Sequence, residues 1–330
     1  MSLRQRIDSR VDRDTSASRL SVAIPFHRLD DYLVRAFESA AKDCTAVDEI
    51  LMINDSNVNS NEVAAWLSSR VALRSAKVRF IDNQTGGIVE ARNLALTHSA
   101  NEFLSFLDSD DIWLPGRRAR HIRILEGNLK ASGVSSNVSY ICVHGRQIGR
   151  SQASHPFLTS TLSPLSRYFP RFRTSSTTIR VSRALSVGGF KEAESDCEDF
   201  GLWLRLQVLD EAILTDRMLA AQYTIHPGQI SNQIGGLAIR EHQLLTLQAL
   251  RSASFERLLP RIFVSQIIRS IVNRGIVSRM LGYTTEISRL TLRDLLSPVL
   301  VLLSIYLHAT ARMYGQSSCE ICELEHAKET

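Results

Sequence analysis

Short apolar runs, each ending in polar residues, recur along the first third of the chain. They span residues 21–25, 49–53, 77–81 and 102–107. Apolar residues at helical spacing occupy the segments between them, at 31–41, at 61–70 and from residue 86 onward. Strands that alternate with helices in this way predict an α/β fold, with a mostly parallel sheet flanked by helices on both faces.

Polar residues follow each of these four apolar runs, at 25–27, 54–55, 82–83 and 108–111. In open parallel sheets, ligands bind outside the carboxyl ends of the strands. We therefore expect the four polar ends to converge on one rim of the sheet and to form a binding site there.

The pattern is weaker between residues 115 and 231. It predicts a helix at 117–129, strands at 138–143 and 174–180, and a short helix at 181–187 that ends in a glycine turn at 188–190. A second acidic cluster, 194–199, then leads into an apolar helix. Acids suit the positive end of a helix dipole, so capping is one explanation of Glu198 and Asp199, and a functional site is the other.

Beyond residue 236 the chain is rich in Leu, Ile, Arg and Ser, and it predicts helices at about 238–258, 261–281 and 287–312. The segment 295–311 lacks charged residues, but Pro298 and His308 interrupt it and it is short for a bilayer span. Two interpretations stay open. The flanking arginines would let this region lie on an anionic membrane, and packing on the preceding domain or in a homo-oligomer fits equally well.

The composition is that of a globular protein, with 330 residues, 44% hydrophobic residues and a formal charge of +5. Five lysines stand against thirty-four arginines. Guanidinium groups suit phosphates and carboxylates, which admits sugar phosphates, anionic lipids and nucleic acid as partners. No basic run is interleaved with aromatic residues, so we expect no nucleic-acid partner.

Two further features bear on location. The five cysteines are widely spaced and do not resemble a secreted disulfide framework, which favours a reducing compartment. Residues 1–20 have no apolar core, so they predict a flexible tail rather than a signal peptide or an anchor. The expected location is cytoplasmic, with peripheral contact at the inner face of the cytoplasmic membrane as an open option.

Three carboxylates, those of Asp108, Asp110 and Asp111, lie within four residues at the end of the fourth apolar run. Like charges at this spacing repel one another, so a folded chain tolerates them where positive charge is present. Mg²⁺ or Mn²⁺ would supply that charge and keep positions open for substrate phosphates. The alternative is a solvated acidic turn in which Asp111 caps the next helix.

Six short motifs follow one another along the chain: 21–26, 53–56, 86–87 with 91–93, 106–111, 188–190, and 198–199 with 204–205. In order and spacing they resemble the inverting family-2 glycosyltransferases of GT-A fold. The resemblance covers about 21–231 and implies a GT-A domain at 21–235. Its nucleotide-sugar-binding half would be 21–111 and its acceptor half 112–235, followed by a C-terminal helical region at 236–330.

The resemblance implies a site for the nucleotide. Asp55 corresponds to the family's acid that accepts a hydrogen bond from uracil N3. Pro25 and Phe26 would line the pocket for the base and the ribose. Asn54 departs from the family's common Asp-Asp pair, which leaves Asp55 to act alone.

The resemblance also implies contacts with the diphosphate and the sugar. Arg92 corresponds to a position near the diphosphate, where a fixed cation is chemically sensible. The alternative is that Arg92 pairs on a helix surface with Glu90 or Asp111. Asp108 and Ser109 would belong to the donor-binding set, with Asp108 near the sugar and the ribose.

A metal site is implied at the acidic cluster, which corresponds to the family's Asp-x-Asp motif. Asp110 would be the direct ligand of Mg²⁺ or Mn²⁺, with Asp108 beside it. His226 resembles a position that sometimes completes the metal shell in this family. The alternative for His226 is a turn residue before Pro227.

The second acidic cluster would supply the base. Displacement of a diphosphate with inversion requires a carboxylate on the side of the sugar that faces the acceptor. Asp199 corresponds to that base, and Glu198 could orient acceptor or sugar hydroxyls. Trp203 offers a flat surface to a sugar, and burial in the core is the alternative.

These residues together predict an inverting, metal-dependent glycosyltransferase. It would move a sugar from a nucleotide-sugar, with UDP as the first choice, to a hydroxyl of a glycan or lipid-linked acceptor in polysaccharide or lipid-linked glycan synthesis. One alternative is a catalytically silent sugar-nucleotide-binding subunit or scaffold. The other, a sugar nucleotidyltransferase, would want a glycine-rich phosphate loop after the first strand, and residues 26–29 contain no glycine.

Overall fold

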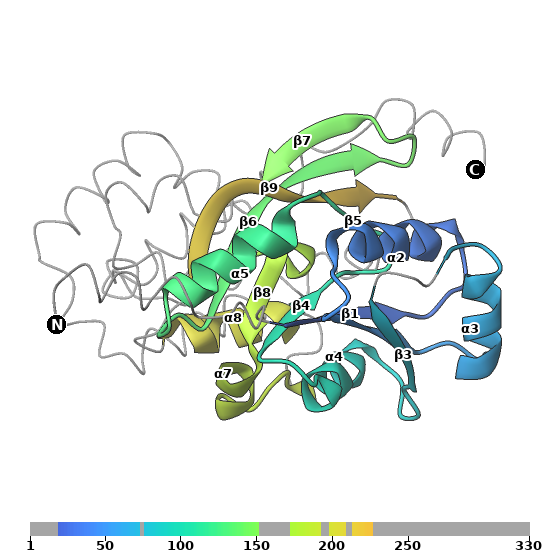
Figure 1. The fold of residues 1–330 in the computed structure, drawn as a ribbon, viewed down its shortest axis with the longest axis horizontal. Coiled ribbons are helices and arrows are strands. Elements are labelled where there is room, and N and C mark those ends of the chain that lie inside the picture. The colour runs from blue at the N-terminus through green and yellow to red at the C-terminus, as the bar shows by residue number, and fades with distance from the viewer. Residues whose placement is uncertain (1–18, 73–75, 152–171, 193–197, 209–212, 227–330) are drawn as a thin grey trace, which may run out of the picture.

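The computed structural model describes residues 19–72, 76–151, 172–192, 198–208 and 213–226. Within these ranges, one nine-stranded sheet is covered by helices on both faces (Figure 1). Most of the predicted N-terminal tail and all of the predicted helices at 238–312 lie outside the described residues. The predicted domain boundary at 235 also lies outside them and stays a prediction.

The strands are β1 (Leu20–Phe26), β2 (Glu49–Asn54), β3 (Lys77–Asp82), β4 (Phe103–Phe106), β5 (Ile112–Trp113), β6 (Gly133–Cys142), β7 (Gln147–Ser151), β8 (Thr177–Arg180) and β9 (Ile213–Ile225). The helices are α2 (Asp31–Asp43), α3 (Ser60–Ser68), α4 (Ile88–His98), α5 (Arg117–Gly127), α7 (Val181–Ser186) and α8 (Glu198–Val208), with a 3₁₀ turn η2 (Thr174–Ser176) before β8. None of these helices combines the length and the apolarity that a bilayer crossing requires.

The first half of the sheet is parallel, with β3, β2, β1 and β4 side by side in that order. These are the four apolar runs identified in the sequence. Their residues are buried on both faces in β1, β2 and β4, which explains why the runs are continuously apolar rather than alternating. The predicted α/β class is confirmed.

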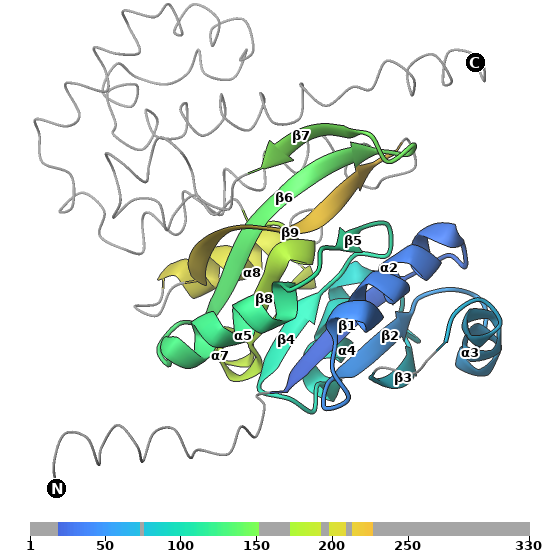
Figure 2. The ribbon, with the colours of Figure 1, turned by 45° about the horizontal axis from the view of Figure 1, so that its top comes forward.

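The second half of the sheet is mixed. Strand β8 is antiparallel to β4 and β6, whereas β9 is parallel to β6 and antiparallel to β5. Strand β7 pairs with β6 at the border of the sheet (Figure 2). The long strand β9 has no counterpart among the predicted elements, because its sequence, ILTDRMLAAQYTI, has only a short apolar run at 218–221 and no strict alternation.

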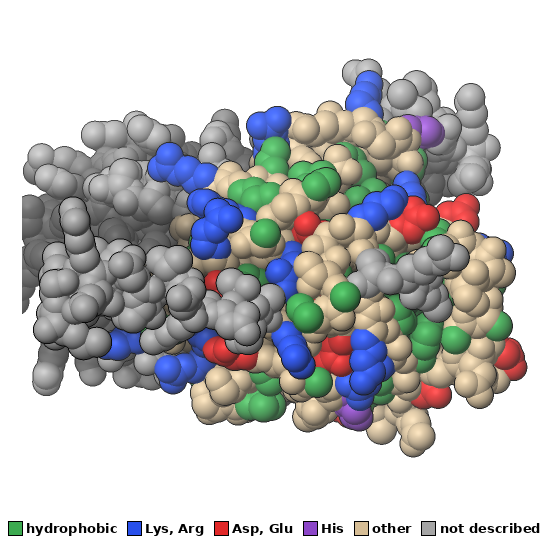
Figure 3. Space-filling model, in the orientation of Figure 1, with side chains coloured by type: hydrophobic (Ala, Val, Ile, Leu, Met, Phe, Trp, Pro, Cys, Tyr) green, Lys and Arg blue, Asp and Glu red, His purple; other side chains and the backbone are tan. Residues whose placement is uncertain are grey.

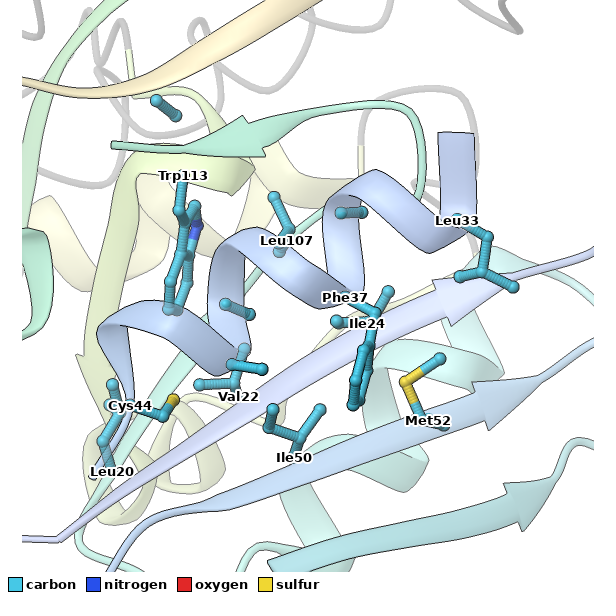
Figure 4. Close-up of a cluster of buried hydrophobic side chains, with 14 of the residues drawn as sticks. Leu20, Val22, Ile24, Leu33, Phe37, Cys44, Ile50, Met52, Leu107 and Trp113 are labelled. Atoms are coloured by element: carbon cyan, nitrogen blue, oxygen red, sulfur yellow. The ribbon is translucent and has the colours of Figure 1, made fainter. Parts of the chain in front are cut away.

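A hydrophobic core lies on each face of the sheet. On one face, side chains of β1 and β2 pack against α2, and Figure 4 shows Ile24 and Ile50 near Phe37. Helices α3 and α5 contribute to the same core. On the other face, α4, α7 and α8 pack against the opposite sides of these strands. The two cores fix the sheet and hold its polar rim in place.

The start of α5 corrects one prediction. The helix begins after Gly116, and the carboxylate of Asp43 accepts hydrogen bonds from the backbone N–H groups of Gly116 and Arg118, each at 2.7 Å. An acid at the end of α2 therefore satisfies the first turn of α5. Asp111 does not cap this helix, so its side chain has another role.

A buried polar layer joins α5 to the second half of the sheet. Arg117 Nη1 donates to Ser105 Oγ at 3.1 Å, and Ser105 Oγ lies 2.5 Å from Thr178 Oγ1. The ring of His121 contacts Thr178 Oγ1 through Nδ1 at 2.7 Å and Ser136 Oγ through Nε2 at 2.8 Å. Burial lowers the pKa of His121 well below its ordinary value, so the ring is neutral.

Candidate functional site

The carboxyl ends of the four parallel strands meet at one edge of the sheet, as predicted. Backbone hydrogen bonds tie each strand end to the next: Asp55 N–H to Phe26 O at 2.8 Å, Asn83 N–H to Asn54 O at 2.8 Å, and Leu107 N–H to Ala23 O at 2.9 Å. The polar residues that follow the strands therefore share one rim. On the face shown in Figure 3, arginine and lysine side chains are dispersed rather than gathered into one patch.

Asp55 is fixed at this rim by the first turn of α4. Its Oδ1 accepts a hydrogen bond from Asn83 Nδ2 at 2.9 Å, and both of its oxygens lie 3.1 Å from Gly87 N. Gly86 and Gly87 have φ of 78° and 92°, a backbone conformation that favours glycine. The glycine pair thus brings the helix start to the carboxylate, and Oδ2 keeps capacity for another donor.

Asn54 supports the rim from below. Its Nδ2 donates to Asp82 Oδ1 at 2.7 Å and to Val58 O at 2.6 Å, and its Oδ1 accepts from Ser56 Oγ at 2.6 Å. An aspartate at position 54 would place its carboxylate at hydrogen-bond distance from the carboxylate of Asp82. The two negative charges would then repel each other. An amide is therefore the better choice in this chain, which explains the departure from the Asp-Asp pair.

Pro25 and Phe26 are both buried. The side chain of Phe26 is 2% exposed and belongs to the same core as Leu33 and Phe37. Its ring therefore lies beneath the rim rather than on it. The contacts predicted between these two residues and a nucleotide stay predictions.

The acidic cluster is divided among separate partners. Asp108 Oδ1 lies 3.0 Å from Arg92 Nη2, and Asp110 Oδ2 lies 3.0 Å from His226 Nε2. The side chains of Asp108 and Asp110 keep 29% and 27% of their surface exposed. Both remain open to a ligand, and the Arg92 guanidinium offsets part of the repulsion between them.

Asp111 is fully buried and faces the other way. Its Oδ2 accepts a hydrogen bond from Ser175 Oγ at 2.5 Å, and its Oδ1 accepts one from Thr224 N at 3.0 Å. Burial, with Asp110 and Asp108 adding to it, raises the pKa of Asp111 well above its ordinary value. This side chain joins parts of the fold and is not exposed to ligands.

Arg92 joins the two acidic clusters. It is 5% exposed, and its guanidinium pairs with Glu198 at the start of α8 as well as with Asp108. The alternative of a surface pairing with Glu90 or Asp111 is therefore wrong. Burial raises the pKa of Glu198 to about 7, although Arg92 opposes the shift. Residues that are 106 positions apart in the chain thus become neighbours at one buried cation.

The glycine turn at 188–190 is held by the residue after Arg92. Asn93 accepts a hydrogen bond from Phe190 N–H through Oδ1 and donates one to Phe190 O through Nδ2, each at 3.0 Å. Gly189 has a φ of 62°, and a Cβ there would meet Asn93 Oδ1 at 2.7 Å. The two motifs therefore pack directly against each other.

Asp199 lies in the first turn of α8, next to Glu198. Its Oδ2 accepts a hydrogen bond from Thr174 Oγ1 at 2.9 Å, and its Oδ1 accepts one from Phe200 N at 2.6 Å. Trp203, further along α8, is 1% exposed and meets Phe190 edge-on. Trp203 is therefore a core residue and does not offer a flat surface to a sugar.

Sequence reasoning missed several residues that support the site. The Tyr32 ring stacks on His226 at a centroid distance of 5.1 Å, and the Arg35 guanidinium lies over Tyr32. Thr174 and Ser175 contact Asp199 and the acidic cluster. The run Thr174-Ser-Ser-Thr-Thr178 was a usable signal, because hydroxyl residues this dense before a buried strand need polar partners.

Asp110 and His226 are the residues that could hold a cation together. No group of three or more His, Cys, Asp or Glu side chains in the described part of the chain has metal-binding geometry. The 3.0 Å between Asp110 Oδ2 and His226 Nε2 matches adjacent ligands of an octahedral ion, which stand about 3 Å apart when each bond is about 2.1 Å. The pair therefore fits part of a shell that substrate oxygens and water would complete.

Solved structures share this fold. The chain aligns with S. aureus TarS 1–349 in complex with UDP-GlcNAc at a TM-score of 0.53 and 17% identity, over 70% of this chain and 66% of that one. It aligns with the UDP complex of TarS 1–349 at the same TM-score and 18% identity, over 84% of this chain and 76% of that one. The expected GT-A fold is confirmed.

The sequence profile of glycosyl transferase family 2 matches residues 21–188, just over half of the 330 residues. The matched region contains the rim and the acidic cluster, and it ends at the first residue of the glycine turn. The chain therefore belongs to glycosyl transferase family 2.

Curated relatives are also similar to this chain in sequence. An uncharacterized glycosyltransferase of Rickettsia bellii is 24% identical over 65% of this chain, which corresponds to 31% of that protein's length. The Escherichia coli UDP-Glc:alpha-D-GlcNAc-diphosphoundecaprenol beta-1,3-glucosyltransferase WfgD is 22% identical over 57% of this chain and 69% of its own length. The chain thus spans less than a third of the Rickettsia protein and about two thirds of WfgD.

Proposed function

We propose that this chain transfers a sugar from a UDP-sugar to an acceptor hydroxyl with inversion at the anomeric carbon. The observation that carries the proposal is the junction at Arg92, which places Asp108 of the rim beside Glu198 and, next to it, Asp199. One buried group would thereby hold the donor side of the site next to the residue before the proposed base. UDP as the nucleotide is supported by the TarS complexes with UDP-GlcNAc and UDP.

The donor would lie along the rim. Asp55 has an oxygen with spare acceptor capacity for an N–H of the base, and α4 starts beside it. Asp108 and Ser109 are partly exposed at the end of β4, where they can accept or donate hydrogen bonds to sugar hydroxyls. Arg92 holds Asp108 in this position, and its positive charge favours the diphosphate nearby.

Asp110 and His226 would hold Mg²⁺ or Mn²⁺, with Asp108 beside them. The cation, when bound, neutralises charge that develops on the departing diphosphate. Tyr32 keeps the imidazole of His226 in place by stacking on it. The role of these protein groups is to present Nε2 and a carboxylate oxygen on the same side of the rim.

Asp199 would act as the general base. The acceptor oxygen bonds to the anomeric carbon while the bond from that carbon to the diphosphate oxygen breaks, and the bonding electrons leave with the diphosphate. The acceptor proton passes to Asp199. Thr174 donates to one of the two carboxylate oxygens and so orients the other. Glu198, with a pKa of about 7, can exchange hydrogen bonds with acceptor or sugar hydroxyls.

The acceptor we propose is a glycan or a lipid-linked glycan. WfgD, by its name, acts on a diphosphoundecaprenol-linked sugar, and this chain is 22% identical to it over 57% of its own length. An acceptor of this kind would bring the enzyme to the cytoplasmic face of the membrane. Contact with the membrane through the region after residue 236, or self-association there, remains part of the proposal.

The test is release of nucleoside diphosphate from a panel of UDP-, GDP- and dTDP-sugars, with Mn²⁺ and with a diphosphate-lipid-linked sugar as the acceptor. We expect release from at least one UDP-sugar that increases when the acceptor is added. Tight UDP binding without release from any donor would contradict transfer and leave a silent binding subunit. Absence of both binding and release would contradict a nucleotide-sugar site altogether.

A further inference from the structure

Asp111 and Ser175 form a buried pair where three segments of the chain meet. These segments are the acidic loop at 108–111, the turn η2, and residues 224–226 at and just after the end of β9. The carboxylate of Asp111 is fully buried, and Ser175 is 1% exposed. The pair lies beneath the candidate site, and the proposed reaction does not use either side chain directly.

Each segment is tied to the pair by hydrogen bonds. The Ser175 hydroxyl donates to Asp111 Oδ2 at 2.5 Å and accepts from Asp108 N at 3.1 Å. Asp111 Oδ1 accepts from Thr224 N at 3.0 Å. Trp113 Nε1 donates to Ser175 O at 2.9 Å, which holds η2 against β5. The pair therefore fixes three backbone segments that are distant in the sequence.

Each of the three segments also carries a residue of the site. The acidic loop carries Asp108 and Asp110. Turn η2 carries Thr174, which donates to Asp199 Oδ2 at 2.9 Å. His226 directly follows the end of β9, two residues after Thr224, and lies 3.0 Å from Asp110. A shift at the pair would therefore move the donor-side acids and the base-side threonine relative to each other.

A buried carboxylate is an expensive way to hold a core together, because apolar residues of similar volume often stabilise a fold as well or better. The three hydrogen bonds of the Asp111 and Ser175 side chains instead fix both the distances and the orientations of the segments that they join. The pair is thus better explained by a geometric requirement than by a gain in stability.

We propose that Asp111 and Ser175 are positioning residues that set the metal-side acids and the base in register for glycosyl transfer. This inference rests on the proposed function. Ser175 acts through the Asp108 backbone and Thr174, whereas Asp111 acts through the end of β9. Neither residue touches substrate.

The test compares Ser175→Ala with Ser176→Ala. Ser176 is also buried and lies in the same turn, but its hydroxyl bonds to Arg173 O and not to the acidic loop. Both full-length variants are measured well below their unfolding temperatures for donor turnover, for Mn²⁺-dependent UDP binding, and for amide hydrogen exchange. Asp111→Asn and Asp111→Ala are compared in the same way, since the amide retains an acceptor for Thr224 N.

We expect Ser175→Ala to lower kcat about 10- to 100-fold, the usual range for supporting residues, and Ser176→Ala to stay within about threefold. Hydrogen exchange in Ser175→Ala should increase in all three segments, and Asp111→Asn should lose less activity than Asp111→Ala. Equal kcat in both serine variants, or faster exchange in η2 alone, would overturn the proposal. If the wild type releases no nucleotide, the proposed function fails, and hydrogen exchange still decides whether the pair links the segments.

Discussion

Identical residue types at the rim take different roles because their surroundings differ. Asp108 and Asp110 are partly exposed, and each faces a basic partner, whereas Asp111 is buried among hydroxyl and amide donors. Glu198 and Asp199 are adjacent in sequence, yet one contacts Arg92 and the other Thr174. Sequence could indicate which positions carry chemistry, but the partners lie tens of residues away and were not predictable from local pattern.

Arg92 should be more important for stability than an exposed basic residue. Arg92→Met leaves Asp108 and Glu198 without their buried cation, and removal of one partner of a buried pair costs about 3–5 kcal/mol. Urea denaturation measures this loss. Lys42→Met, which removes an exposed pair with Glu38 on α2, should cost less than about 0.5 kcal/mol. Similar losses in the two variants would contradict the buried junction.

At the scale of elements, the sequence predicted the first half of the sheet well. Strands β1, β2 and β4 are buried on both faces, so their apolar runs are unbroken and easy to recognise. Strand β9 and the two-residue strand β5 were missed, because one carries Asp216 and Arg217 in its midst and the other is too short to show a pattern. Helix α5 was predicted, but the acid that caps it comes from α2, which no local signal reveals.

The polar layer under α5 predicts a pH dependence of stability. The folded-state pKa of His121 lies well below 6.5, so the unfolded chain binds a proton that the folded chain does not, and stability falls as the pH drops below about 6.5. Between pH 7.5 and pH 5.5, we expect the wild type to lose about 1.4 kcal/mol more than His121→Gln. Urea denaturation across this range measures the difference, and pH 8 gives the pH-independent cost of the substitution. Parallel pH profiles would show that His121 is not held neutral.

The glycine turn after α7 predicts a difference between neighbouring glycines. Gly188 and Gly189 both have positive φ, so alanine at either position should cost about 1–2 kcal/mol. At Gly189 the new Cβ would also displace Asn93, whose two bonds to Phe190 are worth about 1 kcal/mol each. Gly189→Ala should therefore lose clearly more stability than Gly188→Ala in thermal unfolding. Equal losses would mean that Asn93 adapts without cost.

At the scale of the whole molecule, the parallel half of the sheet carries the rim with Asp55 and Asp108, and Thr174, which precedes β8 in the mixed half, contacts Asp199. Strand β4 belongs to both halves, since it pairs with β1 on one side and β8 on the other. The acidic loop that follows β4 thus lies where the halves meet. Arg92 links it to Glu198, and Ser175 links it to the turn that contacts Asp199, the proposed base. The sequence indicated that the two acidic clusters belong to one site, and the fold supplies the groups that join them.

Metal dependence should follow from the rim. Asp110→Ala removes the carboxylate beside His226, so we expect UDP to bind this variant with the same affinity in Mn²⁺ as in EDTA. In the wild type, Mn²⁺ should increase that affinity at least about tenfold, because Asp110 and His226 would hold a cation whose charge would attract the diphosphate. Isothermal calorimetry measures the UDP affinity of the variant and of the wild type under the two conditions. Asp31→Asn, an exposed acid at the start of α2, serves as the control. A Mn²⁺ effect that survives in Asp110→Ala would place the cation elsewhere.

The most direct measurement of the central claim compares Asp199→Asn with Asp31→Asn and the wild type. Both variants replace an aspartate in the first turn of a helix by asparagine. Of the two aspartates, Asp199 alone lies beside Thr174 and the Arg92 junction. If Asp199 is the base, its variant should form glycosylated product about 10²- to 10⁴-fold more slowly, while its UDP affinity stays within about threefold of wild type. Product formation at the wild-type rate by Asp199→Asn would contradict the account.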